Sequence, residues 1–313
     1  MKQENLAFIF PGQGSQKIGM LADLHSAFPV VKSVYDRASE VLGYDLWALS
    51  QEGEQEDINL TERTQPLLLT ASFAMWQVWN ELGGPQPSYM AGHSLGEWSA
   101  LVCAGVIAFE DAVNIVRLRG KYMQEAVPAG EGAMAAIIGL DDEVVASACE
   151  AAREQGEVSL ANFNSPGQLV IAGRKEAVQS AVDRCNEAGA RKAMLLPVSA
   201  PFHTELMKPA ADRLSKDLDS VLFVNPSLPI IHNVHAQAEM EPDNIKSIML
   251  EQIYKPVGWV ACVKSLTTLG CDVAIECGPG KVLAGLVKRI DKGLAVKNVD
   301  SPSLISTAIE SVS

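Results

Sequence analysis

The chain has 313 residues and a mass of 33.5 kDa, and 48% of its residues are hydrophobic while 20% are charged. This composition supports a large buried core and excludes a disordered chain, which would be poor in apolar residues and rich in charge. The 38 acidic against 25 basic residues, with a net charge of -13 and a pI near 4.9, argue against a nucleic-acid-binding protein, which is normally basic.

Membrane insertion, secretion and metal binding are not expected either. The longest apolar run, residues 100–109, is shorter than the ~18 residues that a membrane helix needs, and the apolar stretch before Pro11 is too short for a secretory signal. The 6 cysteines form no C-x-x-C pair, which disfavours a zinc site or a disulfide framework. We therefore expect a cytoplasmic protein that binds neither membrane nor nucleic acid and holds no metal. We also expect a monomer, although no sequence feature determines the oligomeric state.

Strand-like and helix-like segments alternate along the first part of the chain, as in an α/β protein. Residues 6–10 predict a short buried strand that runs directly into a glycine-rich loop. Apolar residues then recur with helical spacing from Pro66, which suits a first helical turn, to Leu82. The segments predicted to follow are a strand over 88–91, a helix over 95–104 and a helix over 110–126.

The segment between residues 129 and 197 has the order β-α-β-β-α-β. Its predicted strands are 133–140, 158–162, 168–172 and 192–196, and its predicted helices are 141–155 and 175–188. This order is that of a ferredoxin-like unit. We therefore predict an inserted ferredoxin-like subdomain over residues 129–197.

The α/β pattern resumes after residue 197. The predicted helices are 204–218, 243–253, 257–269 and 281–290, with strands at 229–234 and 272–276 and a short final helix that Ser301-Pro302 opens. The segments 1–128 and 198–313 are accordingly predicted to form one α/β domain around the insert.

Gly92-His93-Ser94-Leu95-Gly96 is a G-x-S-x-G pattern between a predicted strand and a predicted helix. In that context it is typical of a nucleophile elbow, in which the glycines allow a tight turn and the serine hydroxyl is lifted out of the sheet. The start of the following helix would direct backbone N–H groups toward developing negative charge. Ser94 is therefore the candidate nucleophile.

A serine nucleophile needs a base, and histidine is the usual one. We interpret His93 as structural, because the elbow should direct it away from its neighbour. His203 stands on a predicted loop just before a helix, where catalytic side chains are often presented, and is only slightly favoured over His232 and His235. No particular acidic residue stands out as a third member of a triad.

Arg119 lies within an apolar stripe of the helix predicted over 110–126. Positions 112, 116, 123 and 126 of the same face are Ala, Val, Met and Ala. A buried guanidinium needs a partner, since burial of an unpaired charge is costly. Arg119 either pairs with a carboxylate of the protein or extends its head group to solvent, or it binds the carboxylate of a substrate with two parallel hydrogen bonds.

Two glycine-rich turns and one basic segment complete the candidates. Gly12-Gln13-Gly14 and Gly278-Pro279-Gly280 lack the spacing of a dinucleotide or phosphate loop, so we interpret them as loops beside an active site. The basic segment is either a solvated helix face or a docking surface for an acidic partner. It consists of Lys281, Lys288, Arg289 and Lys292.

Taken together, these motifs resemble a known family. The chain contains, in order, Phe10–Gln16, Gly92–Glu97, Arg119–Lys121, Asn162–Gly167, Pro201-Phe202-His203 and Gly278–Gly280. This set closely resembles the malonyl-CoA:acyl carrier protein transacylases of bacterial fatty acid synthesis, over essentially the whole length. The resemblance implies a hydrolase-like α/β domain that carries the ferredoxin-like insert.

The resemblance also implies roles for individual residues. Ser94 would be the nucleophile and His203 its base, with the backbone carbonyl of Gln252 orienting the imidazole in place of an acid. Gln13 and the backbone N–H of Leu95 would form the oxyanion hole. Arg119 would bind the malonyl carboxylate, and Phe202 and Asn162 would belong to the substrate site.

The activity implied is a ping-pong transfer of malonyl from malonyl-CoA to the phosphopantetheine thiol of an acyl carrier protein, without a metal or redox cofactor. Three alternatives remain open at this point: a serine esterase or thioesterase, a polyketide acyltransferase that acts in trans, and a non-catalytic carrier-binding module. The basic segment with Lys288 and Arg289 would then be the surface on which the carrier protein docks.

Overall fold

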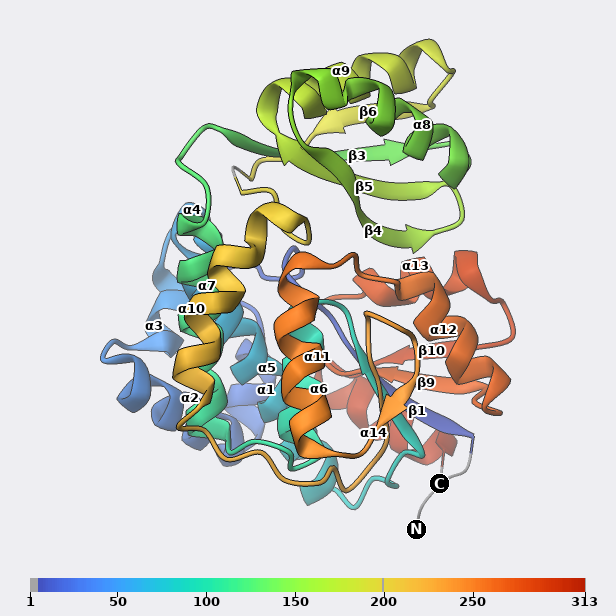
Figure 1. Cartoon of the computed structure of the whole chain (residues 1–313). Coiled ribbons are helices and arrows are strands. Elements are labelled where there is room, and N and C mark those ends of the chain that lie inside the picture. Colours follow the sequence, from blue (N-terminus) through green and yellow to red (C-terminus); the bar gives the residue numbers. More distant parts are fainter. Residues whose placement is uncertain (1–4, 199, 313) are drawn as a thin grey trace.

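Two β-sheets organise the part of the chain that the computed structural model describes, residues 5–198 and 200–312. One sheet belongs to the larger, lower part of the molecule in Figure 1, and the other to the smaller part above it. The observed fold is thus of the mixed α/β kind expected from the alternating segments.

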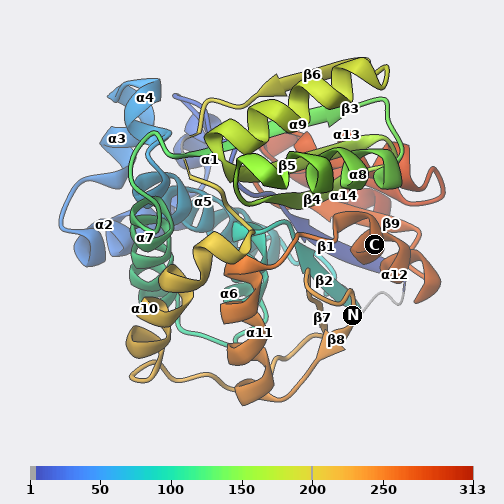
Figure 2. The same cartoon turned by 45° about the horizontal axis from the view of Figure 1, so that its top comes forward.

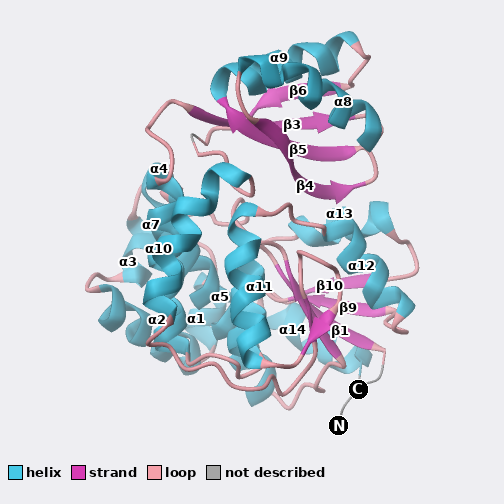
Figure 3. Ribbon diagram, viewed as in Figure 1, coloured by secondary structure: helices cyan, strands magenta, loops and turns pink. Residues whose placement is uncertain are grey.

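The larger sheet has the strand order β10-β9-β1-β2-β7-β8, and Figure 3 labels its strands β10, β9 and β1. Its pairs are parallel except for β7 with β8. The strands are β1 (Leu6–Phe10), β2 (Tyr89–Gly92), β7 (Ile230–Ile231), β8 (Ala238–Glu239), β9 (Val273–Glu276) and β10 (Ala295–Asn298). Every residue of β1 is buried, because helices cover both faces of the sheet.

The alternation of side chains along β1 divides the core of the larger part in two. Phe8 and Phe10 point into a large cluster with α2 (Pro29–Leu42), α5 (Thr61–Glu81), α6 (Leu95–Cys103), α7 (Phe109–Glu125) and α14 (Pro302–Val312). Ala7 and Ile9 point to the other face, where α12 (Trp259–Thr268) and α13 (Val282–Ile290) pack. Helices α10 (Lys208–Leu218) and α11 (Pro242–Tyr254) lie beside α7 and α6 (Figure 1).

Several predicted boundaries in this part were wrong. Helix α5 begins at Thr61, so Pro66 lies inside the helix and beyond its first turn, where buried neighbours such as Thr64 hold the helix together. The helix predicted from residue 204 is divided into a 3-10 turn, η2 (Glu205–Met207), followed by α10. The strand predicted over 229–234 is reduced to the two residues of β7. Elements for which nothing was predicted are β8, β10, α1 (Ala22–Ala27), α2, α3 (Leu46–Glu52) and α4 (Gln55–Ile58).

The smaller part contains an antiparallel sheet with the order β4-β5-β3-β6. In chain order its elements are β3 (Gly132–Ile138), α8 (Asp142–Ala152), η1 (Arg153–Gln155), β4 (Val158–Ser165), β5 (Gln168–Arg174), α9 (Lys175–Glu187) and β6 (Lys192–Leu195). The predicted order of elements is therefore present. Ala135 and Ile171 pack against the two helices, whereas Met134 and Val170 face the larger part.

A short segment of the larger part ties the two parts together. The backbone of Val257 donates to Ala161 O and accepts from the N–H of Phe163, both at 2.9 Å, so the segment continues the edge of the upper sheet beside β4. The smaller part consequently covers the end of the central sheet at which β1 and β2 finish (Figure 2). In parallel α/β sheets that end is where ligands bind.

Candidate active site

A sharp turn between β2 and α6 presents Ser94 at this end of the sheet. Ser94 has φ 50° and ψ -106°, which is unfavourable for a non-glycine residue. A Cβ on Gly92 would lie 1.9 Å from the carbonyl carbon of Gly96, and a Cβ on Gly96 would lie 1.9 Å from Phe10 O. Because no side chain fits at either position, the turn requires both glycines of the G-x-S-x-G pattern.

The hydroxyl of Ser94 lies beside His203, which is distant in sequence. Ser94 Oγ is 2.8 Å from Nε2 of His203, and Nδ1 of the same ring is 2.8 Å from the backbone oxygen of Gln252. A carbonyl oxygen can only accept, so Nδ1 carries the proton and Nε2 is free to accept the serine proton. A backbone carbonyl thus takes the place that an acidic side chain would have in a triad.

The other histidines that the sequence left open lie elsewhere. His232 is fully buried, with Nδ1 against the carboxylate of Glu97, and the ring of His235 lies 6.0 Å from that of His232. His93, interpreted as structural, does line the cavity beside Ser94, where its Nε2 is 2.8 Å from Oδ1 of Asn164 on β4. It therefore connects the elbow to the smaller part.

The surroundings of His203 keep its imidazole neutral. Burial lowers its pKa to about 3, and the positive charge of Arg119 acts in the same direction. A neutral imidazole is the form that can accept a proton. His203 is therefore in its basic form throughout the physiological pH range.

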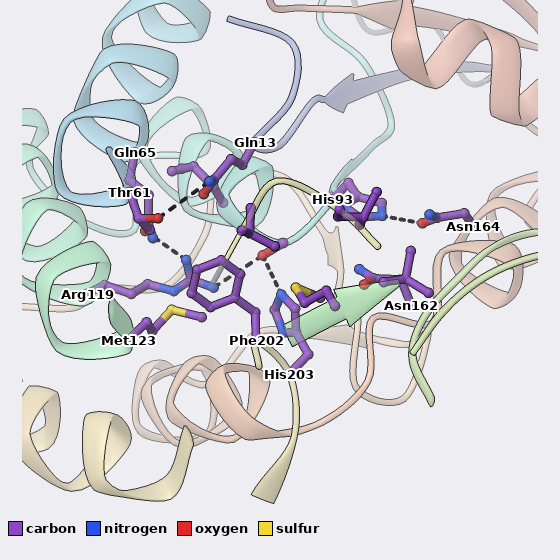
Figure 4. Close-up of a pocket in the computed structure, with 16 residues that line it drawn as sticks. Gln13, Thr61, Gln65, His93, Arg119, Met123, Asn162, Asn164, Phe202 and His203 are labelled. Carbon is purple, nitrogen blue, oxygen red and sulfur yellow. Dashed lines mark hydrogen bonds between the residues drawn. The ribbon is translucent and has the colours of Figure 1, made fainter. Parts of the chain in front are cut away.

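Arg119 projects from α7 into the same cavity, as Figure 4 shows, and is 1% exposed. Its guanidinium donates to Oε1 of Gln65 at 2.7 Å, to Oε1 of Gln252 at 2.8 Å and to Ser94 Oγ at 3.3 Å. Among the described residues no carboxylate forms a salt bridge with it, so the interpretation as a salt bridge within the protein is wrong. Its burial likewise contradicts a head group that extends to solvent. Burial lowers its pKa to about 10, an effect that the negative charge of Glu97 opposes.

These side chains surround a cavity of about 230 Å³ between the two parts of the molecule. Ser94, His203 and Arg119 line it from the larger part, and Asn162 lines it from β4 (Figure 4). Its apolar wall is formed by Met123, Met134, Val170, Leu196, Val198 and Phe202. The cavity thus combines the guanidinium of Arg119 with a serine hydroxyl hydrogen-bonded to a neutral imidazole.

Two residues that line the cavity with Ser94, Gln13 and Leu95, carry N–H groups that could act as donors. Leu95 is the first residue of α6, where backbone N–H groups have no acceptor within the helix. Gln13 lies in the loop after β1, is exposed and lines the cavity, with its Nε2 3.5 Å from Thr61 Oγ1. Both groups are therefore available to an oxygen bound next to Ser94.

Comparison with known proteins agrees with this geometry. A family profile of the acyl transferase domain matches residues 7–310. The chain belongs to the acyl transferase family.

Individual relatives match this acyl transferase over nearly its whole length. The malonyl CoA-acyl carrier protein transacylase of Escherichia coli strain K12 is 54% identical over 304 residues, which cover 97% of the chain and 98% of that relative. A chain in the solved complex of a type II PKS acyl-carrier protein with its malonyl-transacylase is 53% identical, with a TM-score of 0.97 and coverage of 98% of this chain and 99% of that one. The solved malonyl CoA-acyl carrier protein transacylase of Coxiella burnetii is 48% identical, with a TM-score of 0.97 and coverage of 99% and 98%.

The basic segment of the acyl transferase lies outside the cavity. Lys281 precedes α13, Lys288 and Arg289 lie in its last turn, Lys292 follows it, and all of them are exposed. Arg289 donates to Oε1 of Gln168 at the start of β5, so this end of α13 adjoins the smaller part. The segment is a surface feature rather than a component of the pocket.

Sequence reasoning missed several polar residues of the site. Gln65 and Thr61 line the cavity from the start of α5, Asn164 holds His93, and Asn233 accepts the N–H of Ser94 at 2.8 Å. Glu97 is fully buried and is the one charged residue of α6, whose other residues are mostly apolar. A charged residue within an apolar helix is the same signal that identified Arg119, so Glu97 could have been found.

The remaining expectations concern membranes, metals and disulfides. No helix among residues 5–198 and 200–312 is both long and apolar enough to span a bilayer. Over the same residues, no group of three or more His, Cys, Asp or Glu side chains is placed to hold a metal ion. The cysteines at 103, 149, 185, 262, 271 and 277 are free and buried.

Proposed function

We propose that this acyl transferase moves a malonyl group from malonyl-CoA to the phosphopantetheine thiol of an acyl carrier protein, for fatty acid elongation. The observation that carries the proposal is the placement of Ser94 Oγ 2.8 Å from the base His203 and 3.3 Å from the guanidinium of Arg119. The names of relatives at 54% and 48% identity support the same activity.

The first half-reaction forms an acyl-enzyme. Nε2 of His203 takes the proton of Ser94 Oγ while that oxygen attacks the thioester carbonyl. The oxyanion accepts hydrogen bonds from the backbone N–H of Leu95 and the amide of Gln13. Collapse of the tetrahedral intermediate breaks the C–S bond, the imidazolium returns its proton to the departing thiolate, and malonyl-Ser94 and coenzyme A result.

The second half-reaction reverses these roles. His203 takes the proton of the carrier protein's thiol, the sulfur attacks the ester carbonyl, and the same donors stabilise the oxyanion. The C–O bond to Ser94 breaks, and the serine oxygen recovers a proton from the imidazolium. Each step uses protein groups and the two substrates alone, so the proposal requires no cofactor.

Arg119 supplies the selectivity in this proposal. Because its guanidinium lies 3.3 Å from Ser94 Oγ, a short acyl chain esterified to that oxygen can bring a terminal carboxylate against it. An acetyl group has no such carboxylate. Phe202 and Asn162 border the same cavity and limit the size of the acyl group, which favours malonyl over branched chains.

We propose that the carrier protein docks on the basic segment of Lys281, Lys288, Arg289 and Lys292. These cations are exposed at one edge of an otherwise acidic protein, where they would attract an acidic partner. Reversal of Lys288 and Arg289 to Glu should weaken transfer to the carrier protein and leave acylation by malonyl-CoA intact. An equal effect on both half-reactions would refute this docking site.

The finer architecture is proposed as well. The strand order β4-β5-β3-β6 with both helices on one face supports a ferredoxin-like subdomain over 129–197. The elbow at the end of a parallel sheet supports a hydrolase-like α/β domain over 1–128 and 198–313, of which residues 1–4, 199 and 313 lie outside the described residues. We also propose that the protein acts as a cytoplasmic monomer.

A second candidate is a polyketide acyltransferase that acts in trans, which the similarity to a chain in the PKS carrier complex favours. It would share the chemistry and differ in the preferred carrier protein. A serine esterase would need no cation against the acyl chain, and a binding module would need neither Ser94 nor His203.

Intact-protein mass spectrometry separates these activities. The enzyme and its Ser94→Ala variant are mixed with malonyl-CoA, and holo acyl carrier proteins of fatty acid and polyketide type are then added. We expect a malonyl adduct that requires Ser94 and moves to a carrier protein. The carrier protein that is malonylated faster distinguishes a fatty acid enzyme from a polyketide enzyme. Hydrolysis without delivery would indicate an esterase, and no adduct would indicate a binding module.

A further inference from the structure

A buried carboxylate lies directly beneath the site and takes no part in the proposed chemistry. Glu97 stands in the first turn of α6 and is 0% exposed. Its Oε1 accepts from Nδ1 of His232 at 2.5 Å, and its Oε2 accepts from Nε2 of Gln252 at 2.8 Å and from the N–H of Asn233 at 3.2 Å. Burial of a carboxylate is costly unless hydrogen bonds compensate it, as these three donors do. A buried charge that the fold stabilises in this way next to the site calls for a functional explanation.

Gln252 connects this carboxylate to the residues of the pocket. Its Nε2 also donates to Ser94 O at 2.8 Å, while its Oε1 accepts from Arg119 Nη2 at 2.8 Å. Its backbone oxygen is the acceptor for His203 Nδ1. The nitrogen of the Gln252 amide thus contacts Glu97, and the oxygen of the same amide contacts Arg119.

The orientation of the Gln252 amide matters for Arg119. If the amide were turned by 180°, its NH2 group would face the N–H donors of Arg119, and its oxygen would face the carboxylate of Glu97 and the carbonyl of Ser94. Donors would then oppose donors and acceptors would oppose acceptors. An ionised carboxylate can only accept, so Glu97 selects the orientation in which Oε1 faces Arg119.

His232 keeps Glu97 in place as an acceptor. Among the described residues His232 Nε2 has no hydrogen-bond partner. A proton on Nδ1 alone satisfies the short contact with Glu97 and leaves only a lone pair at Nε2, which is less costly than an unpaired buried N–H. The negative charge therefore remains on Glu97, where it faces the positive charge of Arg119 across the amide and raises the pKa of that guanidinium.

We propose that Glu97 is a positioning residue for substrate selection. Through the amide of Gln252 it holds the guanidinium of Arg119 where an acyl carboxylate can bind, and so it sets the preference for malonyl over uncharged acyl groups. This inference rests on the proposed function, in which Arg119 binds the malonyl carboxylate.

The test compares acylation of Ser94 by malonyl-CoA and by acetyl-CoA in Glu97→Met and Glu97→Gln. The methionine has a similar length but no acceptor for Gln252. Its kcat/KM with malonyl-CoA should fall about a hundredfold, as expected for a binding group displaced by about 1 Å, while acetyl transfer should change little. The glutamine keeps an oxygen for Gln252 and Asn233, and its NH2 group can donate to Nδ1 of His232 if the imidazole proton moves to Nε2. The unpaired N–H that results lowers stability, but the malonyl preference should stay near that of the wild type.

A matched control changes the same buried cluster without touching Gln252. His232→Gln retains a donor to Glu97, and its ratio of malonyl to acetyl transfer should equal that of the wild type. If Glu97→Met yields no folded protein, the double variant Glu97→Met/His232→Phe decides, because it also removes the imidazole that Glu97→Met would leave buried without its acceptor.

The outcomes are distinguishable. A wild-type enzyme without a malonyl preference overturns the proposed function and this inference with it. A wild-type preference that survives in Glu97→Met, or an equal loss with both acyl groups, overturns the inference alone. A selective loss with malonyl-CoA that Glu97→Gln restores supports it.

Discussion

Replacement of Arg119 by methionine is the most informative perturbation of this site. Among the described residues that line the cavity, Arg119 is the one permanent cation, and it is 1% exposed. A malonyl carboxylate bound there would lose its partner in a water-excluded site. Loss of one member of a buried ion pair costs about 3–5 kcal/mol, which corresponds to a decrease of about 150- to 5,000-fold in kcat/KM.

The same substitution should not slow acetyl transfer, because the charge that weakens His203 as a base is removed, and its effect on stability should be moderate. The pKa of Arg119 is about 10 instead of 12.5, so removal of this charge relieves about 3 kcal/mol of unfavourable burial. Against this gain, the oxygens of Gln65 and Gln252 lose a donor, at about 1–3 kcal/mol each. The free energy of unfolding should therefore change by no more than about 2–3 kcal/mol.

The assay measures kcat/KM for acylation by malonyl-CoA and acetyl-CoA, together with urea denaturation. Arg117→Met is the matched control: Arg117 lies on the same helix, donates to Asn114 and does not line the cavity. Its two rate constants should resemble those of the wild type. If Arg119→Met keeps its preference for malonyl, or if both thioesters lose activity equally, the assigned role of Arg119 is wrong.

Three further predictions concern neighbouring groups. Because the pKa of His203 is about 3 in the folded protein against 6.5 ordinarily, its contribution to stability should be complete above pH 6.5 and lost as the pH falls toward 3. The acylation rate should accordingly show no titration midpoint near 6.5, and a midpoint there would contradict this assignment. Gln13→Ala should reduce kcat by about a hundred- to a thousandfold with stability unaffected, and steady-state kinetics with a small effect would remove Gln13 from the oxyanion hole. Gly96→Ala should destabilise the fold by at least about 3 kcal/mol, because its Cβ would meet Phe10 O at 1.9 Å; an unchanged midpoint of urea denaturation would show that the turn can open.

The elbow and the buried arginine could be predicted because their signals are local. The two glycines around Ser94 are needed within a single turn, so pattern and geometry coincide. Arg119 was recognisable as a charge in an apolar helical stripe, and its neighbourhood required a partner. The choice of His203 from the residues alone could not be made firmly, since a loop 109 residues away must meet the serine.

Other elements lacked such signals or their signals were overlooked. In α2 the buried residues Val31, Val34, Tyr35 and Ala38 follow a helical period that could have been found. Helix α4 has four residues and β7 has two, which is too short for any periodicity. Pro66 suggested a helix start, but burial of the preceding turn outweighs the hydrogen bond that proline removes.

In the proposed mechanism, the charge of Arg119 affects the base His203 as well as the binding of the substrate. After burial, that charge is the second cause of the low pKa of His203. When a malonyl carboxylate pairs with the guanidinium, the local positive charge is neutralised and the imidazole becomes a stronger base. An acetyl group leaves the charge in place, so His203 stays weakly basic and attack by Ser94 is slower. One buried cation can therefore discriminate twice, in binding the acyl group and in activating the nucleophile.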